Sequence, residues 1–234
     1  MSKTVRKTGL FGGTFDPVHT GHLFLAEAAR DKFGLDEVLF WPNPAPYHRA
    51  GSEVTPLEDR IVMTKLAVSD NPAFRFSDFE ISLPGDSYTA KTLELFHEKY
   101  PELELYFILG GDSLFSIEYW KYPEKIFSLA TILSCKRQGQ QRGATGILHP
   151  SSASCGAAPK HAAEDAGASL DDKIDSKIRE LKERYGARIF NLHVPEIEIS
   201  SSDIKARVRD GRSIKYCTPD KVAEYIYEKR LYVN

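Results

Sequence analysis

Two histidines near the start of the chain have the residue type and spacing to do chemistry. His19 and His22 stand in the stretch GGTFDPVHTGH, which follows a short apolar run. A turn from a first strand into a first helix offers unpaired N–H groups and a partial positive charge, and Gly12 and Gly13 let a ligand approach the backbone. Three residues apart on a helix, both imidazoles can lie on one face. The stretch therefore predicts a phosphate-binding turn.

Each histidine alone has another explanation, because a lone histidine here is more often a helix cap or a core residue. The pair together, with the glycines and at the carboxyl end of the first strand, favours a ligand site. The stretch matches neither GxGxxG nor GxxxxGK[ST], so the dinucleotide and P-loop fingerprints do not apply.

A second candidate lies near the C-terminus in the stretch ISSSDIK. It places three hydroxyls, those of Ser200, Ser201 and Ser202, at the start of a predicted helix and Lys205 one turn later. Serines at a helix start usually serve only as caps. Two helix N-termini with a cation between them could also hold a polyphosphate.

Alternating apolar runs and amphipathic segments must position these residues. Helices are predicted after the first turn with a stop at Gly34, and after Thr55, where Thr55 and Glu58 form a capping box around Pro56. Another Thr-Pro pair, at Thr218, predicts the last helix. Strands are predicted in the segments VRKTGLF, EVLFWP, FRFSDFEI, LELYFILGG, ATILSC and ARIFNLHV. The alternation predicts an α/β fold, a doubly wound parallel sheet with helices on both faces.

The alternation breaks at about 138–173, where 17 of 36 residues are Gly, Ala or Ser. Such a segment buries too little surface to offset its ordering entropy. We expect a flexible insertion in a single domain spanning 1–234, with a C-terminal helical part from about 200; a lid ordered by a ligand or partner is the alternative. His149, Cys155 and His161 in this stretch match no metal-ligand spacing.

Composition and charge narrow the class of protein to which this chain can belong. The net charge of -2, without a long block of one sign, argues against a nucleic-acid partner. Cys135, Cys155 and Cys217 are too few and scattered for a disulfide framework, which favours a cytoplasmic location. No signal peptide and no apolar run of ~20 residues is found, so no membrane partner is expected. The oligomeric state cannot be read from the sequence.

Taken together, the motifs carry a family resemblance. The stretch GGTFDPVHTGHL resembles the (T/H)xGH signature of the nucleotidyltransferase superfamily, and ISSSDIK resembles its ISSTxxR signature. The segments EISLPGDSYTAKTL, YFILGGDSL with Trp120 downstream, and TPDKVAEYIYEKRLY are similar to the bacterial nicotinate mononucleotide adenylyltransferase family. The resemblance implies a Rossmann-like domain that joins ATP to nicotinate mononucleotide, giving deamido-NAD and pyrophosphate.

The resemblance also implies roles for particular residues. His19, His22 and Lys205 would be catalytic, supplying positive charge to the phosphates. ATP would be bound by Gly12, Gly13, Thr14, Phe15, His19, His22, Gly110, Asp112, Ser201, Ser202 and Lys205. The pyridine mononucleotide would be bound by His48, Tyr88, Thr89 and Trp120. Trp120 alone would more often be a core residue. Mg²⁺ would arrive with the ATP, because no carboxylate cluster that could hold it is evident.

Some positions depart from the family pattern. Pro46, Tyr47, His48 and Arg49 replace a Pro-Pro-His-Lys run; Leu83 and Lys205 replace arginines, and Lys91 an aspartate. These changes leave three alternatives. The acceptor could be nicotinamide mononucleotide or phosphopantetheine, the protein could be a nucleotide-binding regulator without activity, or the motifs could be coincidental in a Rossmann-like domain.

Overall fold

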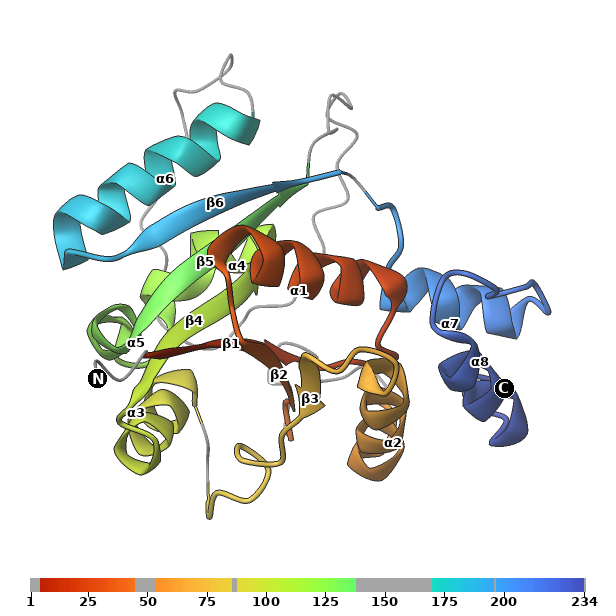
Figure 1. The fold of residues 1–234 in the computed structure, drawn as a ribbon. Coiled ribbons are helices and arrows are strands. Elements are labelled where there is room, and N and C mark those ends of the chain that lie inside the picture. Colours follow the sequence, from red (N-terminus) through yellow and green to blue (C-terminus); the bar gives the residue numbers. More distant parts are fainter. Residues whose placement is uncertain (1–4, 45–53, 86–87, 138–169, 196, 234) are drawn as a thin grey trace.

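A six-stranded parallel sheet forms the centre of the molecule (Figure 1). The computed structural model describes residues 5–44, 54–85, 88–137, 170–195 and 197–233. The strands are β1 (Arg6–Gly13), β2 (Glu37–Pro42), β3 (Phe74–Phe76), β4 (Leu103–Gly110), β5 (Ala130–Arg137) and β6 (Ile189–Val194). Their order is β3-β2-β1-β4-β5-β6, and every neighbouring pair is parallel. This doubly wound order reverses direction between β1 and β4, the switch point where such folds bind ligands.

Helices cover both faces of the sheet, as the alternation predicted. They are α1 (Thr20–Phe33), α2 (Leu57–Val68), α3 (Thr89–Lys99), α4 (Gly111–Ser116), α5 (Pro123–Leu129), α6 (Leu170–Tyr185), α7 (Ser201–Arg209) and α8 (Asp220–Glu228). One core cluster contains side chains of α1, α2, α7 and α8, and the other contains those of α3, α4, α5 and α6. None of the described helices is long and apolar enough to cross a membrane.

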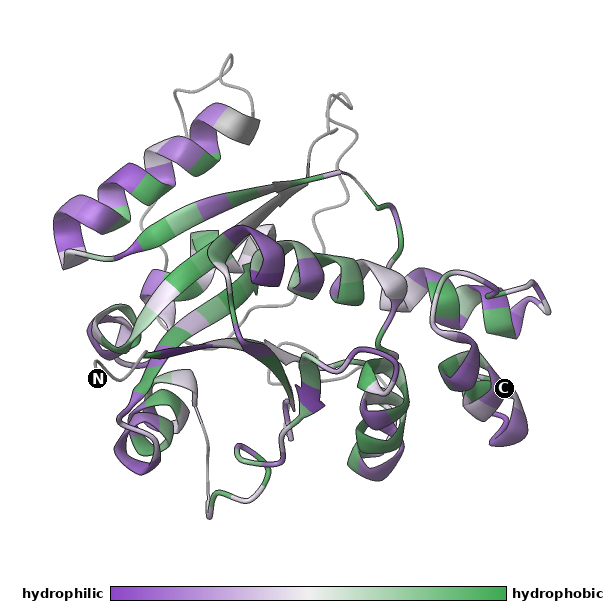
Figure 2. Ribbon diagram, in the orientation of Figure 1, coloured by the Kyte–Doolittle hydropathy of each residue, from purple (hydrophilic) through white to green (hydrophobic). Residues whose placement is uncertain are grey.

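The strands divide their side chains between these two cores. On β1, Leu10 enters the α3–α6 core while the next residue, Phe11, enters the α1–α2 core. Phe107 and Ile108 of β4 divide in the same way, because successive strand residues point to opposite faces. Figure 2 shows the central strands largely in the apolar colour and the outer parts of α6 in the hydrophilic colour. Because β1 and β4 are anchored in a core on each face of the sheet, their carboxyl ends are held in fixed positions.

Three local predictions need correction. Neither predicted threonine cap forms, because Pro56 and Pro219 occupy the N-cap positions of α2 and α8. The Thr55 N–H and the Thr218 hydroxyl bind the turn after β1 instead. The third strand ends at Phe76 rather than Ile81, because the chain turns there and the Ser82 N–H donates to the carbonyl of Asp78 at 2.9 Å. The Gly34 stop is confirmed: this residue is the C-cap of α1, with a φ of 62°.

The Gly/Ala/Ser-rich stretch is only partly described. Helix α6 begins at Leu170, so the last four residues of the predicted insertion at 138–173 are helical. The apolar spacing of Ile174, Ile178 and Leu181 places all three in the core. His149, Cys155 and His161 lie outside the described residues, as does the 45–53 segment with Tyr47 and His48.

Candidate active site

The turn between β1 and α1 borders a cavity at the carboxyl ends of the central strands. The cavity has a volume of about 190 Å³. Four residues assigned to ATP from the sequence line it together: Gly12, His19, His22 and Gly110. Gly110 is the N-cap of α4, and Asp112 lies in the first turn of that helix. The sequence motif after β1 and the one after β4 therefore meet where the strand order reverses.

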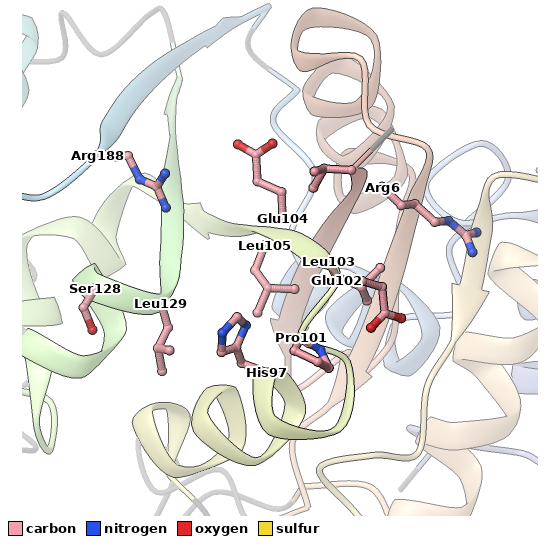
Figure 3. Close-up of a pocket in the computed structure, with 11 residues that line it drawn as sticks. Arg6, His97, Pro101, Glu102, Leu103, Glu104, Leu105, Ser128, Leu129 and Arg188 are labelled. Carbon is pink, nitrogen blue, oxygen red and sulfur yellow. The ribbon is translucent and has the colours of Figure 1, made fainter. Parts of the chain in front are cut away.

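Another cavity lies at the opposite edge of the sheet (Figure 3). Its volume is about 660 Å³, and it is lined by residues near the amino ends of strands, among them Arg6, Leu103 and Arg188, and by His97 of α3. Ligands of open α/β sheets bind at the carboxyl ends of the strands. The smaller cavity beside His19 and His22 is therefore the candidate site.

The two histidines form a stacked pair. Their ring centroids are 3.6 Å apart and their planes differ by 24°. His19 is the N-cap of α1, and its backbone N–H donates to Nδ1 of His22 at 3.2 Å. This bond is half of a capping box, so the capping explanation holds for His22 as well. Because Nδ1 accepts a hydrogen bond, the proton of the neutral ring is on Nε2, which makes Nε2 a donor.

Aromatic rings fix His22 from the side of the core. Phe15 meets it edge-to-face with centroids 5.2 Å apart, and Phe11 does so at 5.9 Å. Phe15 is 2% exposed and does not line the cavity, so the structure places it behind the surface of the site. Its φ of 48° is unusual for a residue with a side chain. A Cβ on Gly13 would lie 2.9 Å from the Phe15 ring, so the glycine makes room for the wall behind His22.

Glycine is needed at one more place in the turn. A Cβ on Gly21 would lie 3.1 Å from Nδ1 of His19, closer than nearly all real Cβ contacts. A side chain there would push against the imidazole that stacks on His22.

The predicted serines have three different environments. Ser200, the first of the three serines at the predicted helix start, is the N-cap of α7, and its hydroxyl accepts the Asp203 N–H at 3.0 Å, which confirms the serine cap. The Ser201 hydroxyl donates to the carbonyl of Pro17 at 2.9 Å. Ser202 is exposed. Helix α7 thus begins directly beside the turn that carries the histidines.

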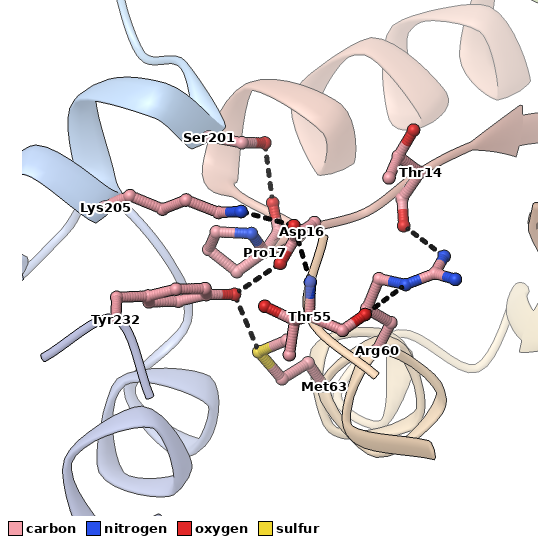
Figure 4. A network of polar contacts seen from close by, with 9 residues as sticks. All are labelled: Thr14, Asp16, Pro17, Thr55, Arg60, Met63, Ser201, Lys205 and Tyr232. Atoms are coloured by element: carbon pink, nitrogen blue, oxygen red, sulfur yellow. Dashed lines mark hydrogen bonds and ion pairs between the residues drawn. The ribbon is translucent and has the colours of Figure 1, made fainter. Parts of the chain in front are cut away.

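Lys205 of α7 forms an ion pair with Asp16, whose side chain is fully buried (Figure 4). The Thr55 N–H donates to Oδ2 of Asp16 at 3.2 Å, and the Tyr232 hydroxyl donates to Oδ1 at 2.9 Å. Burial alone would raise the pKa of Asp16, but the bonds from Lys205, Thr55 and Tyr232 and the charge of Lys205 outweigh it and lower this pKa. Burial and the charge of Asp16 raise the pKa of Tyr232, so its hydroxyl stays a donor.

The side chain of Arg60, in α2, donates hydrogen bonds to the backbone of the same turn. It is 2% exposed and donates to the carbonyls of Asn43 at 2.8 Å, Thr14 at 2.9 Å and Thr55 at 3.0 Å. Burial lowers the pKa of Arg60, and the negative charge of Asp16 acts in the opposite direction. One guanidinium therefore joins the segments that follow β1 and β2 to the start of α2.

The residues assigned to the pyridine lie to one side of this cavity. Tyr88 is the N-cap of α3 and Thr89 is its first residue. The Lys121 ammonium lies 4.3 Å from the centroid of the Tyr88 ring. Trp120 packs edge-on against Phe107 of β4, with centroids 6.4 Å apart, so it partly fits the core explanation. None of these residues lines the 190 Å³ cavity, and His48 lies outside the described part.

Comparison with known proteins settles the family. The cytidylyltransferase-like family model matches residues 10–207. A curated relative from Lachnoclostridium phytofermentans, named "Probable nicotinate-nucleotide adenylyltransferase", is 38% identical over 229 residues, which are 98% of this chain and 100% of the relative. The chain belongs to the nicotinate-nucleotide adenylyltransferase family.

Solved structures support the family fold. The Plasmodium falciparum nicotinic acid mononucleotide adenylyltransferase, complexed with NaAD, superposes with a TM-score of 0.69 at 17% identity, covering 97% of each chain. The same enzyme complexed with APC gives a TM-score of 0.68 at 17% identity, again covering 97% of each chain. At these identities the likeness extends to the fold alone.

Sequence reasoning missed three residues around the family motifs. Asp16 stands inside the GGTFDPVHTGH stretch, but the motif gave it no role of its own. Tyr232 is 216 residues away along the chain, and no periodicity joins it to Asp16. Arg60 looked like an ordinary charge in an amphipathic helix. The only available signal was an acidic residue within a binding motif, which needs a partner if it is buried.

Proposed function

We propose that this chain transfers the adenylyl group of ATP to nicotinate mononucleotide, forming deamido-NAD and releasing pyrophosphate. The family assignment supports this activity. The observation that carries the proposal is the stacked His19–His22 pair at the start of α1, at the switch point of the sheet. The start of α7 lies against the same turn through Ser201 and Pro17. Two helix N-termini and two imidazoles suit a chain of phosphates.

The reaction needs no nucleophile from the protein. An oxygen of the mononucleotide phosphate attacks the α-phosphorus of ATP and forms the new P–O bond. The bond from the α-phosphorus to the oxygen bridging to the β-phosphorus breaks, and its electron pair leaves with pyrophosphate. Both reactants are anions, so catalysis consists of holding them in line and neutralising the charge that grows on the leaving group.

The residues of the turn have the donors for this task. Nε2 of His22 carries the proton of the neutral ring, because Nδ1 is taken by the His19 N–H. We assign to this Nε2 the role of stabilising the negative charge that develops on the phosphates. His19 is 5% exposed and stacked on His22, which restricts the motion of both rings. Lys205 adds a full positive charge from α7.

Magnesium is proposed to arrive bound to the phosphates of ATP. In the described part of the chain no three His, Cys, Asp or Glu side chains gather in a way that could hold a metal ion. The acidic residue of the turn, Asp16, already accepts bonds from Lys205, Thr55 and Tyr232. Because the oxygens of Asp16 are occupied by these donors, the turn suits an ion that keeps most of its ligands from ATP and water.

The surroundings of Tyr88 favour an acidic acceptor. Helix α3 starts at Thr89 and has no acidic residue in its first turn. The Lys121 ammonium lies over the Tyr88 ring. A carboxylate on a pyridine held there would meet the positive end of a helix and a cation, whereas an amide would gain less from either.

The test is pyrophosphate release from ATP and Mg²⁺ with three acceptors assayed in parallel: nicotinate mononucleotide, nicotinamide mononucleotide and phosphopantetheine. We expect strong preference for the nicotinate form. Preference for another acceptor would overturn the substrate while leaving adenylyl transfer intact. Tight ATP binding with no pyrophosphate from any acceptor would overturn the activity and favour a regulatory nucleotide-binding protein.

A further inference from the structure

The C-terminal part of the chain holds nearly every residue of the turn that carries His19. Segments from 201 to 232 make six contacts with residues 16 to 20. Ser201 donates to the carbonyl of Pro17 and Thr218 to that of Val18, Thr20 donates to the carbonyls of Cys217 and Tyr216, and Lys205 and Tyr232 donate to the Asp16 carboxylate. Four of them end on backbone carbonyls and fix the path of the chain, whereas the two to Asp16 converge on one carboxylate.

The ion pair on that carboxylate takes two charges out of water. The Asp16 side chain is fully buried, and Lys205 is only 15% exposed. Removing two charges from water costs free energy that their attraction often fails to return, so a buried ion pair is weak support for stability. Well-packed apolar residues could have joined α7 to the turn. The pair therefore calls for a role beyond joining these elements.

The geometry suggests what the role is. The Lys205 ammonium has three N–H donors, one of which goes to Asp16, and its flexible stem would otherwise leave it many rotamers. The Tyr232 ring lies 5.0 Å from the same ammonium, and the Tyr232 hydroxyl holds the other oxygen of Asp16. A cation fixed in this way before substrate binds has less freedom to lose when it meets a phosphate.

We propose that Asp16 and Tyr232 are positioning residues, which hold Lys205 in place against the phosphate-binding turn. This proposal rests on the proposed adenylyl transfer. It makes Tyr232, near the end of the chain and given no role by the sequence, part of the catalytic geometry.

The charged and titratable groups around Asp16 come from several elements. Lys205 faces it from α7, Arg60 acts on it from α2, and Tyr232 approaches from the segment after α8. Asp59 of α2 acts electrostatically on Tyr232. Because the neighbours of Asp16 are cations and a neutral hydroxyl, it stays ionised and keeps its hold on Lys205 throughout the neutral range.

The decisive variant is Tyr232→Phe, which removes the hydroxyl bond to Asp16 and keeps the ring beside Lys205. Tyr225→Phe is its matched control. Tyr225 lies in α8, and its hydroxyl donates to Asp59 at 2.8 Å, the same kind of bond, without contacting the turn. Both changes should lower the melting temperature by similar amounts. We expect Tyr232→Phe to lower kcat by roughly 3- to 10-fold and Tyr225→Phe to leave it within about 2-fold of wild type.

A double-mutant cycle separates positioning from a general structural effect. Lys205→Met should lower kcat strongly, and adding Tyr232→Phe to it should change kcat by less than about 2-fold, because the hydroxyl acts through Lys205. Multiplicative losses in the double variant would overturn the proposal. So would a Tyr232→Phe enzyme as active as Tyr225→Phe, measured below both melting temperatures. Absence of pyrophosphate release by the wild type with every acceptor would instead overturn the proposed function.

Asp16→Asn provides a second measurement on the full chain. It removes the charge that holds Lys205 but keeps the size of the side chain. We expect a loss in kcat of up to about 100-fold with a smaller change in the KM for ATP. An increase in KM with kcat unchanged would contradict positioning. If Asp16→Asn does not fold, the double-mutant cycle of Lys205→Met and Tyr232→Phe tests the proposal by itself.

Discussion

The imidazole of His22 accepts a hydrogen bond from the backbone N–H of His19 while the two rings stack 3.6 Å apart. One histidine is therefore both part of a helix cap and a candidate phosphate donor. Nδ1 serves the cap, and Nε2, which carries the proton of the neutral ring, is the nitrogen that we assign to the phosphates. The two tasks use different nitrogens, so different substitutions separate them.

We predict opposite effects for two amide substitutions at His22. Asparagine places its oxygen near the position of Nδ1, so His22→Asn should keep the cap and the melting temperature but lose the donor and most of the activity. Glutamine reaches toward Nε2, so His22→Gln should keep more activity and melt earlier, a lost cap costing about 1 kcal/mol. Thermal unfolding and steady-state rates on both variants check this. The reverse ranking in both assays would contradict the division of tasks.

A second prediction concerns Gly21, in the first turn of α1. Alanine favours helix over glycine by up to about 1 kcal/mol, so Gly21→Ala should not lower the free energy of unfolding. The new methyl would press on the His19 ring, 3.1 Å away, and disturb the stack on His22. We expect kcat to fall roughly 10-fold, because small displacements of catalytic groups are costly. Urea unfolding with steady-state kinetics tests this, and an undiminished kcat would show that the stacking geometry is not needed.

Arg60 should be essential for stability. Arg60→Met leaves the partly buried carbonyls of Thr14, Asn43 and Thr55 without their donor. The loss should exceed about 3 kcal/mol, since each unsatisfied buried group costs on the order of 1 kcal/mol or more. Arg75→Met is the control, because Arg75 is 64% exposed and its partner Glu37 keeps a second ion pair, with Arg6 at 3.0 Å. It should cost less than about 1 kcal/mol in urea unfolding, and equal costs for the two variants would contradict the account of Arg60.

Asp16 should make stability depend on acidic pH. Its pKa in the folded protein lies below the ordinary value of 3.8, so the unfolded chain binds more protons in the window between the two. The stabilising contribution of Asp16 is therefore complete above that ordinary value and is lost as the pH falls through the folded pKa. Urea unfolding from pH 6 downward should show a shallower acid loss for Asp16→Asn than for wild type. Asp70→Asn, at an exposed ion pair with Lys221, should leave the slope nearly unchanged. Parallel curves for wild type and Asp16→Asn would contradict the lowered pKa.

The sequence was sufficient for the fold and for four of the residues that line the cavity, Gly12, His19, His22 and Gly110, whereas others, such as Phe24 and Ile197, were not predicted. Periodicity and turn residues predicted the parallel sheet, and the spacing of His19 and His22 predicted that both would meet at the start of α1. The two Thr-Pro caps were wrong, because proline took the cap position and the threonines bound the first turn. Asp16 and Tyr232 could not be paired from the sequence, since a contact across 216 residues leaves no local pattern. The roles of all the predicted site residues, from His19, His22 and Lys205 to Thr89 and Trp120, stay predictions.

The most direct test of the central claim is the kinetics of His22→Ala with ATP and nicotinate mononucleotide. His97→Ala, which changes a histidine at the opposite edge of the sheet, is the control. If His22 stabilises charge that develops in the transition state, His22→Ala should lower kcat about 100-fold or more while the KM for ATP changes little, and His97→Ala should match wild type. If kcat and affinity for ATP fell equally, or if His22→Ala kept its kcat, the stacked pair would not be the catalytic centre of this protein.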